Sequence, residues 1–561
     1  MTGRKAVTLG IVIALIVTMI AACSSNNNSK ENTAANNENT ANNDTVKTNP
    51  NAKYNPPIEM TTVKNVAADL KFKEGESIEN NVLNRAIEED LGIKMKYLWT
   101  TSDVNAFNEK LRLMLASNQK MPDIVATDDD LVLADLMASG KFMDVEELFN
   151  KYAGDYWKSV MDNHPEAWYK TTLNGKIMAI PKLNWLNQGD TVLWIREDWM
   201  KKLNLTAPKT LDDLEAIMDA FVNQDPDGDN KKDTYGLAIS LKGALNTWMA
   251  NGDWIGGAYG VIQGSWNKGE EGKLVNGDIR PEMKPALERL ASWMKKGYLS
   301  PDAATVDEMK ATELFTQEKA GIVAGAYWMP GFPLPDLMKV NPKAEYKAYQ
   351  VPVGPDGKAG YHTNASVGAG GMLISKDYDH PEAAIKYLNW FFDNYANPEP
   401  GTKYEHGLAK GYDWDEKDGK IVQSDPWFDV VRYSVSTDGA RVPEQFRDSM
   451  VKISSGAEPT TPFEIARKNG ETPATLHAFD VIMDGEKKGY AIQGEFTGAP
   501  TKTMQSKKSI LDKMRLDVYT KIIYGREPID AFDKFVEDWY KNGGEQMTKE
   551  VNEWYDNVTK K

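Results

Sequence analysis

Cysteine, histidine and excess positive charge are all scarce in this sequence. Its 561 residues include one cysteine, Cys23, and five histidines, and its formal net charge is −16. A single cysteine excludes an intramolecular disulfide framework and leaves the rest of the chain without thiol chemistry. The negative charge argues against a nucleic-acid-binding protein, because phosphates require a basic surface, and against broad adhesion to an anionic membrane.

Motifs that mark common catalytic sites are also missing. The sequence has no G-x-S-x-G, no H-E-x-x-H and no phosphate-binding loop, and the glycine-rich run at 368–371 lacks the third spaced glycine of a dinucleotide fingerprint. A glycoside hydrolase would need two carboxylates at a set separation, and no pair among the 82 acidic residues is marked as such. We therefore expect a protein that is not an enzyme.

The N-terminus is typical of an exported chain. Arg4 and Lys5 precede an apolar run at 9–22, which is shorter than the roughly 20 residues of a transmembrane helix. A positive start, a short apolar region and small residues before a cut site predict a signal peptide, residues 1–22. Ile20-Ala21-Ala22-Cys23 resembles the lipobox of bacterial lipoproteins. The resemblance implies fatty acyl chains such as palmitate on Cys23, which anchor the chain to the cell membrane outside the cytoplasm.

Residues 23–57 are predicted to form the lipidated Cys23 and a flexible tether. The segment is rich in Asn, Thr, Ser and Ala, and Tyr54 is its only aromatic residue. Such a composition cannot bury enough apolar area to offset the entropy of ordering. A cleaved pro-segment is the alternative. The chain from Ile58 onward is long for a single core and predicts at least two lobes.

Strand and helix signals alternate along this body, which predicts an α/β fold. Strands are predicted at 58–63, 93–99, 122–126, 320–323 and 367–374. Helices are predicted at 80–91, 104–118, 381–392, 506–523 and 528–542. No internal repeat is present.

The order of several segments resembles the extracellular solute-binding lipoproteins of ABC importers, in particular the large carbohydrate-binding branch similar to alginate- and maltose-type binding proteins. The segments that carry the resemblance are 107–125, 173–181, 194–205, 208–214, 318–328 and 543–554, together with the lipobox. It implies a two-lobed, type II periplasmic-binding-protein-like fold with discontinuous lobes and a hinge. Lobe one would hold 58–183 and 355–398, and lobe two would hold 190–350 and 400–561. Crossings are expected near 181–190, 349–360 and 394–401.

The same resemblance implies that the protein works as a monomer. It would capture an oligosaccharide in the cleft between the lobes by hinge closure and deliver it to the membrane permease of an ABC transporter. Two alternatives stay open. A binding protein for peptides or another small polar solute also uses aromatic residues, and a lipoprotein that presents a ligand to a membrane sensor would have the same sequence features.

Aromatic rings and carboxylates are expected to bind the ligand, because sugars present apolar C–H faces edged with hydroxyl groups. By the resemblance, maltose-type proteins place a sugar-stacking tryptophan at the position of Trp328. Asp253 is expected to reach solvent between two tryptophans. Core packing is the alternative for each aromatic. The predicted ligand-binding residues are Trp185, Trp248, Trp254, Tyr327, Trp328, Asp128, Asp130 and Asp253, with Trp266, Asn184, Asn187, His362 and Asn364 as weaker candidates.

Asp128 and Asp130 are included because they follow the predicted strand 122–126. Ligands of α/β sheets lie at the carboxyl ends of strands, so these side chains are placed for cleft contact. Their alternative role is the N-cap of the helix that starts near Leu131.

An acidic loop predicts a structural Ca²⁺ site outside the cleft. Asp225, Asp227, Asp229 and Asp233 stand at positions 1, 3, 5 and 9 of an EF-hand-like loop, with the Lys231 carbonyl at position 7. Asn230 replaces the usual glycine at position 6, and Gly236 replaces the glutamate at position 12. By the resemblance, alginate-type relatives carry an acid at the position of Thr234, so the sixth ligand is in doubt. The alternative is a solvated acidic turn.

Overall fold

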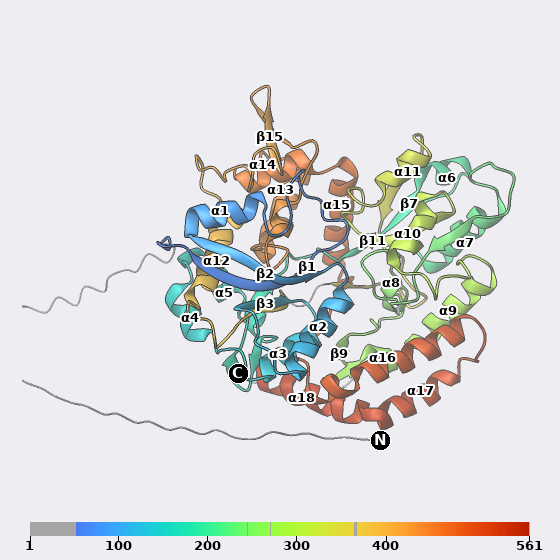
Figure 1. The fold of residues 1–561 in the computed structure, drawn as a ribbon. Coiled ribbons are helices and arrows are strands. Elements are labelled where there is room, and N and C mark those ends of the chain that lie inside the picture. The colour runs from blue at the N-terminus through green and yellow to red at the C-terminus, as the bar shows by residue number, and fades with distance from the viewer. Residues whose placement is uncertain (1–51, 244, 270, 364–366, 560–561) are drawn as a thin grey trace, which may run out of the picture. The chain divides into compact units, whose positions relative to one another are not determined.

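The computed structural model describes residues 52–243, 245–269, 271–363 and 367–559 (Figure 1). The described residues all belong to one compact unit. The predicted signal peptide, Cys23, most of the predicted tether and the weaker ligand candidate Asn364 lie outside the described residues. No helix within the described ranges is long and apolar enough to cross a membrane.

The folded body begins earlier than the expected boundary at residue 57. The backbone N–H of Tyr54 donates to the Leu91 carbonyl over 2.8 Å. The Tyr54 hydroxyl donates to the Glu382 carboxylate over 2.7 Å, and the Lys386 ammonium lies 4.3 Å from the ring centre. The expectation that Tyr54 belongs to the tether is therefore wrong, because this single aromatic finds a docking site on two helices.

One lobe is built on a sheet in which β14 pairs antiparallel with both β3 and β6. β1 and β2 pair in parallel next to it, and the Thr62 hydroxyl of β1 donates to the Ile124 carbonyl of β3. The strands are β1 (Ile58–Asn65), β2 (Ile93–Thr101), β3 (Ile124–Thr127), β4 (Thr172–Leu173), β5 (Lys176–Ile177), β6 (Ile180–Leu183) and β14 (Gly368–Ile374). The helices are α1 (Val82–Leu91), α2 (Val104–Ala116), α3 (Asp130–Ala138), α4 (Glu146–Tyr152), α5 (Asp155–Asn163) and α12 (Glu382–Phe391).

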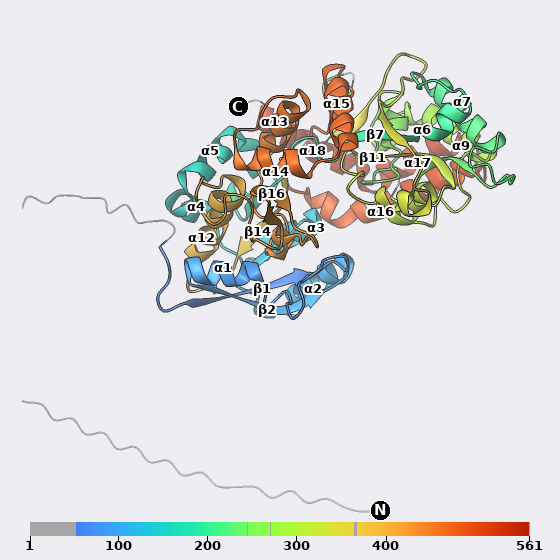
Figure 2. The ribbon, with the colours of Figure 1, turned by 90° about the horizontal axis from the view of Figure 1, so that it is seen from above.

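The other lobe is built on a four-stranded sheet in the order β12-β7-β11-β8. β11 pairs antiparallel with β7 and parallel with β8. The strands are β7 (Thr191–Arg196), β8 (Tyr235–Ala238), β9 (Trp266–Lys268), β10 (Leu274–Asn276), β11 (Ala320–Ala326) and β12 (Tyr346–Tyr349). The helices are α6 (Glu197–Lys202), α7 (Leu211–Asn223), α8 (Asp253–Gly257), α9 (Met283–Lys295), α10 (Glu308–Thr316) and α11 (Pro335–Val340). Figures 1 and 2 show the two lobes side by side.

Strand periodicity places each central sheet between two layers of helices. On β7, Leu193 and Ile195 pack against α7, α9 and the C-terminal helices, whereas Val192 and Trp194 pack on the opposite face. Successive side chains of a strand point to opposite faces, so a strand that is buried on both sides is mainly apolar, and in β7 the two polar residues, Thr191 and Arg196, stand at its ends. All six residues of β7 are buried, as this arrangement requires.

The C-terminal third supplies helices to both faces of the β7–β11 sheet. Its elements are β13 (Tyr361–Thr363), β15 (Trp414–Lys417), β16 (Lys420–Gln423), α13 (Pro443–Ser454), α14 (Pro462–Gly470), α15 (Pro473–Lys487), β17 (Ala491–Gln493), α16 (Lys502–Ile523), α17 (Ala531–Trp539) and α18 (Glu545–Thr559). α13 and α15 cover one face of the β7–β11 sheet, and α16, α17 and α18 join the layer on the other face.

The lobe boundaries differ from the expected ones in two places. Tyr404, Leu408 and Tyr433 pack in the core of the β1–β3 lobe, so residues 404–440 do not belong to lobe two. Residues 355–361 pack with the β7–β11 lobe, and the chain returns to the first lobe between Tyr361 and Val367. The last crossing accordingly falls between Ala440 and Phe446 rather than near 394–401.

Local signals explain where several helices of the first lobe begin and end. Asn81 caps α1 by accepting from the Asn84 N–H, and Gly92 ends the helix in the left-handed conformation, with φ 67°. Asp103 caps α2 and Asp129 caps α3 in the same way. The predicted helices at 80–91 and 104–118 are confirmed.

Candidate ligand-binding cleft

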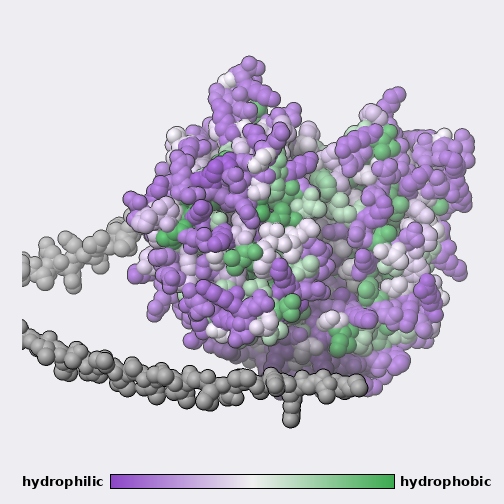
Figure 3. Space-filling view, in the orientation of Figure 1, coloured by the Kyte–Doolittle hydropathy of each residue, from purple (hydrophilic) through white to green (hydrophobic). Residues whose placement is uncertain are grey.

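A cavity of about 1010 Å³ is lined by residues of both lobes. This volume is at the upper end of the range for small-molecule sites and suits a ligand larger than a single sugar. The outer surface seen in Figure 3 is mainly hydrophilic, with hydrophobic residues gathered toward the groove between the lobes. The cavity is lined by Asp128–Leu131, Lys170, Lys182, Asn184, Gln188, Trp248, Gly264–Trp266, His362, Gly368–Gly370, Asp438, Arg441, Gly494, Phe496–Gly498, Pro500, Met504, Lys508, Ser509 and Asp512.

Asp128 and Asp130 line this cavity at the carboxyl end of β3. The N-cap role considered for them is filled by Asp129, whose carboxylate accepts from the Val132 N–H over 2.8 Å. The other two carboxylates are therefore not used in helix capping. Gly370 makes this turn possible, because its φ is +85° and a Cβ there would lie 2.2 Å from the Thr127 carbonyl oxygen.

An ion-pair network lies beneath these carboxylates. The Lys182 ammonium is 2.6 Å from Asp128 and 2.8 Å from Asp438, and Arg441 lies 2.6 Å from the other oxygen of Asp438. Arg441 also donates to Gln188 over 2.8 Å. The network joins β6, the 184–190 crossing and the segment before α13, so it ties the floor of the cleft to the hinge.

The pKa values in this network follow from burial and ion pairing together. Loss of solvation raises the pKa of Asp128, although the adjacent Lys182 ammonium partly offsets it. The Asp128 side chain is 62% exposed, so the protein atoms that line the cleft remove only part of its solvation. Burial alone would also raise the pKa of Asp438, but Arg441 and Lys182 outweigh it and the pKa is lowered.

Trp248 is the most exposed aromatic side chain in the lining, with 46% of the residue accessible. Its backbone N–H donates to the Glu308 carboxylate over 2.7 Å, which fixes the loop that carries it. Trp266 also lines the cavity but is 6% exposed. An accessible indole face held by a fixed backbone is suited to stacking on the apolar face of a sugar ring.

The other predicted aromatic residues lie elsewhere. Trp254 is fully buried, and its indole N–H donates to the Asn251 carbonyl. Tyr327 and Trp185 are buried in the layer that contains α13 and α15. Trp328 is partly buried outside the cavity lining and donates to the carbonyl of Gln188, which does line it. None of these four residues presents a free ring to the cleft in this structure.

Asp253 is buried rather than exposed, so the expectation that it reaches solvent is wrong. It starts α8, is 1% exposed and accepts from the His362 N–H over 2.9 Å. Asp190, which is fully buried, accepts from the Thr363 hydroxyl over 2.6 Å. Burial raises the pKa of Asp253 to about 7 and that of Asp190 to about 6. The two carboxylates lie beside the crossing between the lobes.

Replacing Asp253 with asparagine is expected to stabilise the protein above pH 7. The raised pKa means that the folded state holds a proton that the unfolded chain, with an ordinary pKa of 3.8, releases. This contribution to stability is present at acid pH and is lost as pH rises through about 7. Asparagine stays neutral, so the variant should gain on the order of 3 kcal/mol at pH 8, about a third of that gain at pH 5, and almost nothing below pH 4, because the loss in the native chain accumulates between the unfolded pKa of 3.8 and the folded pKa of about 7. Thermal unfolding across pH, with the exposed Asp533→Asn as control, measures this, and parallel profiles would contradict it.

Sequence reasoning missed most of the charged lining. Asn184 was predicted from its place at the expected crossing after Pro181. Lys182 lies at the same crossing and lines the cavity, so the same position could have identified it as well. Asp438 carries no such signal, because it meets Lys182 only through packing between residues 256 positions apart, and Arg441 joins the network through Asp438.

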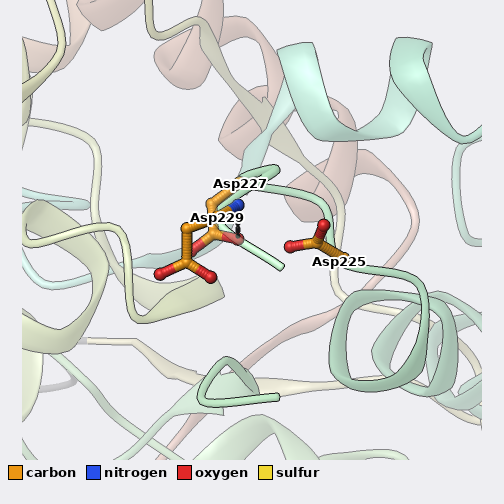
Figure 4. Close-up of side chains that lie close together, drawn as sticks. All are labelled: Asp225, Asp227 and Asp229. Atoms are coloured by element: carbon orange, nitrogen blue, oxygen red, sulfur yellow. Dashed lines mark hydrogen bonds between the residues drawn. The ribbon is translucent and has the colours of Figure 1, made fainter. Parts of the chain in front are cut away.

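The acidic loop between α7 and β8 brings three carboxylates together, as Figure 4 shows. One oxygen each of Asp225, Asp227 and Asp229 lie within 4.8 Å of one another. Asn230 takes the left-handed conformation that the usual glycine would adopt, with φ 60°. Partial burial and the adjacent Asp225 raise the pKa of Asp227. Hard oxygen ligands in this arrangement fit Ca²⁺.

The remaining members of the predicted metal set are engaged differently. Asp233 lies 2.7 Å from the Lys319 ammonium, and the Lys231 ammonium lies 2.9 Å from Asp229. The Thr234 hydroxyl donates to the Phe221 carbonyl and is buried away from the loop. The three clustered carboxylates are therefore the part of the loop that fits a cation as it stands.

Comparison with known proteins gives a consistent result. The sequence profile described as "Bacterial extracellular solute-binding protein" matches residues 71–397. The chain is 25% identical to Lipoprotein LipO of Bacillus subtilis over 84% of its length and 88% of that protein. It is also 25% identical to the polygalacturonan/rhamnogalacturonan-binding protein YtcQ of Bacillus subtilis, over 84% of this chain and 87% of that one.

Two solved structures share the fold. The alginate-binding protein AlgQ2 without calcium ion superposes with a TM-score of 0.65 at 18% identity, over 90% of this chain and 99% of the other. An EF-hand mutant of the S. pneumoniae ABC-transporter substrate-binding protein FusA, in complex with fructo-nystose, gives a TM-score of 0.64 at 17% identity, over the same shares. At these identities the likeness concerns the fold, which is two-lobed and of the type II binding-protein class.

Proposed function

Because the chain belongs to the bacterial extracellular solute-binding protein family, we propose that it captures an oligosaccharide between its lobes and delivers it to the permease of an ABC importer. The observation that carries this proposal is that the exposed indole of Trp248 and the exposed carboxylates of Asp128 and Asp130 line one cleft. The indole face would stack on a sugar ring, and the carboxylates would accept hydrogen bonds from its hydroxyl groups.

The ligand would be bound by closure of the lobes around the crossings at 184–190 and 441–445. Hinge closure removes water from both sides of a ligand, and the closed form then differs in shape from the open form. A permease can use this difference to recognise the loaded protein. We place the protein outside the cytoplasm as a monomer, anchored by a lipidated Cys23, in keeping with the lipobox and with the similarity to Lipoprotein LipO.

Thermal unfolding of residues 49–561 with a panel of oligosaccharides, peptides and amino acids tests the proposal. A ligand present at 100 times its dissociation constant adds about 2.7 kcal/mol to the free energy of unfolding. We expect a rise in midpoint with one class of oligosaccharide. A rise with peptides alone would contradict the oligosaccharide function and favour a peptide-binding protein.

We also propose that Asp225, Asp227 and Asp229 hold a structural Ca²⁺ ion, with the Lys231 carbonyl and Asp233 completing the set. The three clustered carboxylates support this, and an ion there would replace the Lys231–Asp229 pair with metal coordination. The site lies between α7 and β8, away from the cleft lining, so its role would be to stabilise the second lobe.

The calcium site predicts a metal-dependent midpoint. Adding Ca²⁺ after chelation should raise the thermal midpoint of the native chain, and Asp227→Asn should abolish the rise because a ligand charge is lost. Asp418→Asn, at the turn between β15 and β16, is the matched control and should respond as the native chain does. Equal responses of Asp227→Asn and the native chain would contradict the site.

A further inference from the structure

Two ion pairs of the cleft, Asp128–Lys182 and Asp130–Lys170, are layered with the carboxylate outermost. The Asp128 side chain is 62% exposed, whereas that of its partner Lys182 is 10% exposed. The Asp130 side chain is 46% exposed, whereas that of its partner Lys170 is 15% exposed. At these two pairs, a ligand that enters the cleft from solvent therefore meets carboxylate oxygens before ammonium groups, whereas at the Lys508–Asp512 pair the lysine is the more exposed partner, at 49% against 35%.

The cations of the described lining are also neutralised by protein groups. Arg441 is 11% exposed and pairs with Asp438, and Lys170 lies 3.0 Å from Asp130. Lys508 is more accessible than the three other basic residues of the lining, Lys170, Lys182 and Arg441. Its ammonium lies 2.5 Å from Asp512 on the same helix. Every lysine and arginine of the described lining is thus already paired with a protein carboxylate when an anion enters the cleft.

We infer that this cleft selects uncharged, hydroxyl-rich oligosaccharides and rejects those that carry a carboxylate on each sugar. The inference rests on the proposed function and specifies its substrate class. Sugar hydroxyl groups would donate to Asp128 and Asp130 in charge-assisted hydrogen bonds, which are stronger than neutral ones. A uronate chain would instead bring its carboxylates against these two, and like-charge contact disfavours a wrong partner.

The inferred preference for uncharged oligosaccharides differs from the ligand class that the name of YtcQ suggests. That relative is named for polygalacturonan and rhamnogalacturonan, which are polymers of acidic or partly acidic character, and it is 25% identical to this chain. The net charge of −16 acts in the same direction as the cleft, because a negative protein repels polyanions at long range.

A matched pair of ligands tests the inference. Isothermal titration of the chain with galacturonate oligomers and with the methyl esters of the same oligomers varies charge at constant length and ring structure. The panel is completed by neutral galactan, arabinan, xylan, mannan and fructan fragments and by alginate fragments. We expect the best neutral ligand to bind at least tenfold more tightly than any acidic one, and the esters to bind no more weakly than the acids.

A variant with opposite effects on the two ligand classes makes the test specific. Asp130→Asn removes an exposed carboxylate and leaves Lys170 unpaired, so affinity for the best neutral ligand should fall about tenfold while affinity for uronate oligomers rises several-fold. Asp533→Asn changes the net charge equally on α17, outside the cleft lining, and should change neither. Thermal midpoints without ligand establish that both variants fold.

The outcomes separate the inference from the proposed function. Tighter binding of acidic oligomers than of neutral ones would overturn the inference and leave the oligosaccharide function intact. Losses of equal size for both ligand classes in Asp130→Asn would overturn the role of charge. Absence of binding by every oligosaccharide would overturn the proposed function and the inference with it.

Discussion

Replacing Trp248 with alanine is expected to weaken oligosaccharide binding about tenfold and to leave the stability of the unliganded protein nearly unchanged. Complete burial of an aromatic side chain is worth about 1.5–3 kcal/mol, and about half of this residue is already covered. Covering the remainder with a sugar ring should therefore contribute on the order of 1.4 kcal/mol, which is a factor of about ten in affinity. Isothermal titration measures the loss directly.

Trp427 provides a close control for this variant. It is also 46% exposed, but it lies outside the cleft lining, in the segment after β16. Trp427→Ala should bind the ligand as the native chain does and should show the same small change in thermal midpoint as Trp248→Ala. Unchanged binding by Trp248→Ala, or equal losses in both variants, would contradict the stacking role of Trp248.

Replacing Lys182 with methionine is expected to have the largest effect on stability near the cleft. The substitution leaves Asp128 and Asp438 adjacent without their shared cation, and removal of one partner from a buried ion pair costs about 3–5 kcal/mol. Because Asp128 is largely exposed to water, we expect the lower end of this range. The thermal midpoint should fall by several degrees, and ligand affinity should fall with it because the carboxylates lose their fixed positions.

The pH dependence of this variant distinguishes charge from packing. In the native chain the pKa of Asp438 is lowered, so its stabilising contribution is present above the ordinary pKa of 3.8 and is lost at more acid pH. Without Lys182 the two carboxylates repel each other, and protonation relieves the repulsion. The deficit of Lys182→Met should therefore shrink as pH falls from 7 toward 4.

Lys534→Met serves as the control, because it removes one cation from an exposed pair within α17. Its side chain is 76% exposed and lies 2.8 Å from Asp538, so solvent screens the pair and the expected change in thermal midpoint is small. Equal thermal midpoints of Lys182→Met and Lys534→Met would contradict the stabilising role of the ion-pair network beneath the cleft. A deficit independent of pH would indicate lost packing rather than lost charge.

Local sequence signals predict much of this fold because they report on neighbouring residues. Asn81 and Gly92 mark both ends of α1, and the apolar residues Phe107, Leu111 and Met114 mark the buried face of α2. The alternation of strands and helices gives the α/β class. These features depend on hydrogen bonds and side-chain spacing within a few residues, which the sequence contains.

The division of the chain between lobes depends on contacts that are distant in sequence. Residues 404–440 pack on the first lobe because Tyr404 stacks edge-on against Trp390 and the Tyr433 hydroxyl donates to the Lys71 carbonyl. The sequence of the segment does not indicate which residues these side chains contact. The predicted position of the third crossing, near 394–401, was wrong for this reason.

The same limit applies to the candidate site. Trp248 and Trp254 are six residues apart, yet one is 46% exposed in the cleft and the other is fully buried. Their local sequences give both the same aromatic and apolar character. Asp128 and Asp130 were identifiable, because they follow a strand at the carboxyl edge of a sheet, which is a position defined by local order. Arg441 was not, since its place comes from tertiary packing.

A crystal structure of residues 49–561 with the oligosaccharide that gives the largest thermal shift tests the central claim most directly. The account predicts a sugar ring stacked on the Trp248 indole, with its hydroxyl groups within hydrogen-bond distance of Asp128 or Asp130 and with both lobes in contact with the ligand. An oligosaccharide bound outside the cleft would contradict the account. So would an oligosaccharide in the cleft that contacts neither Trp248 nor either of the two carboxylates.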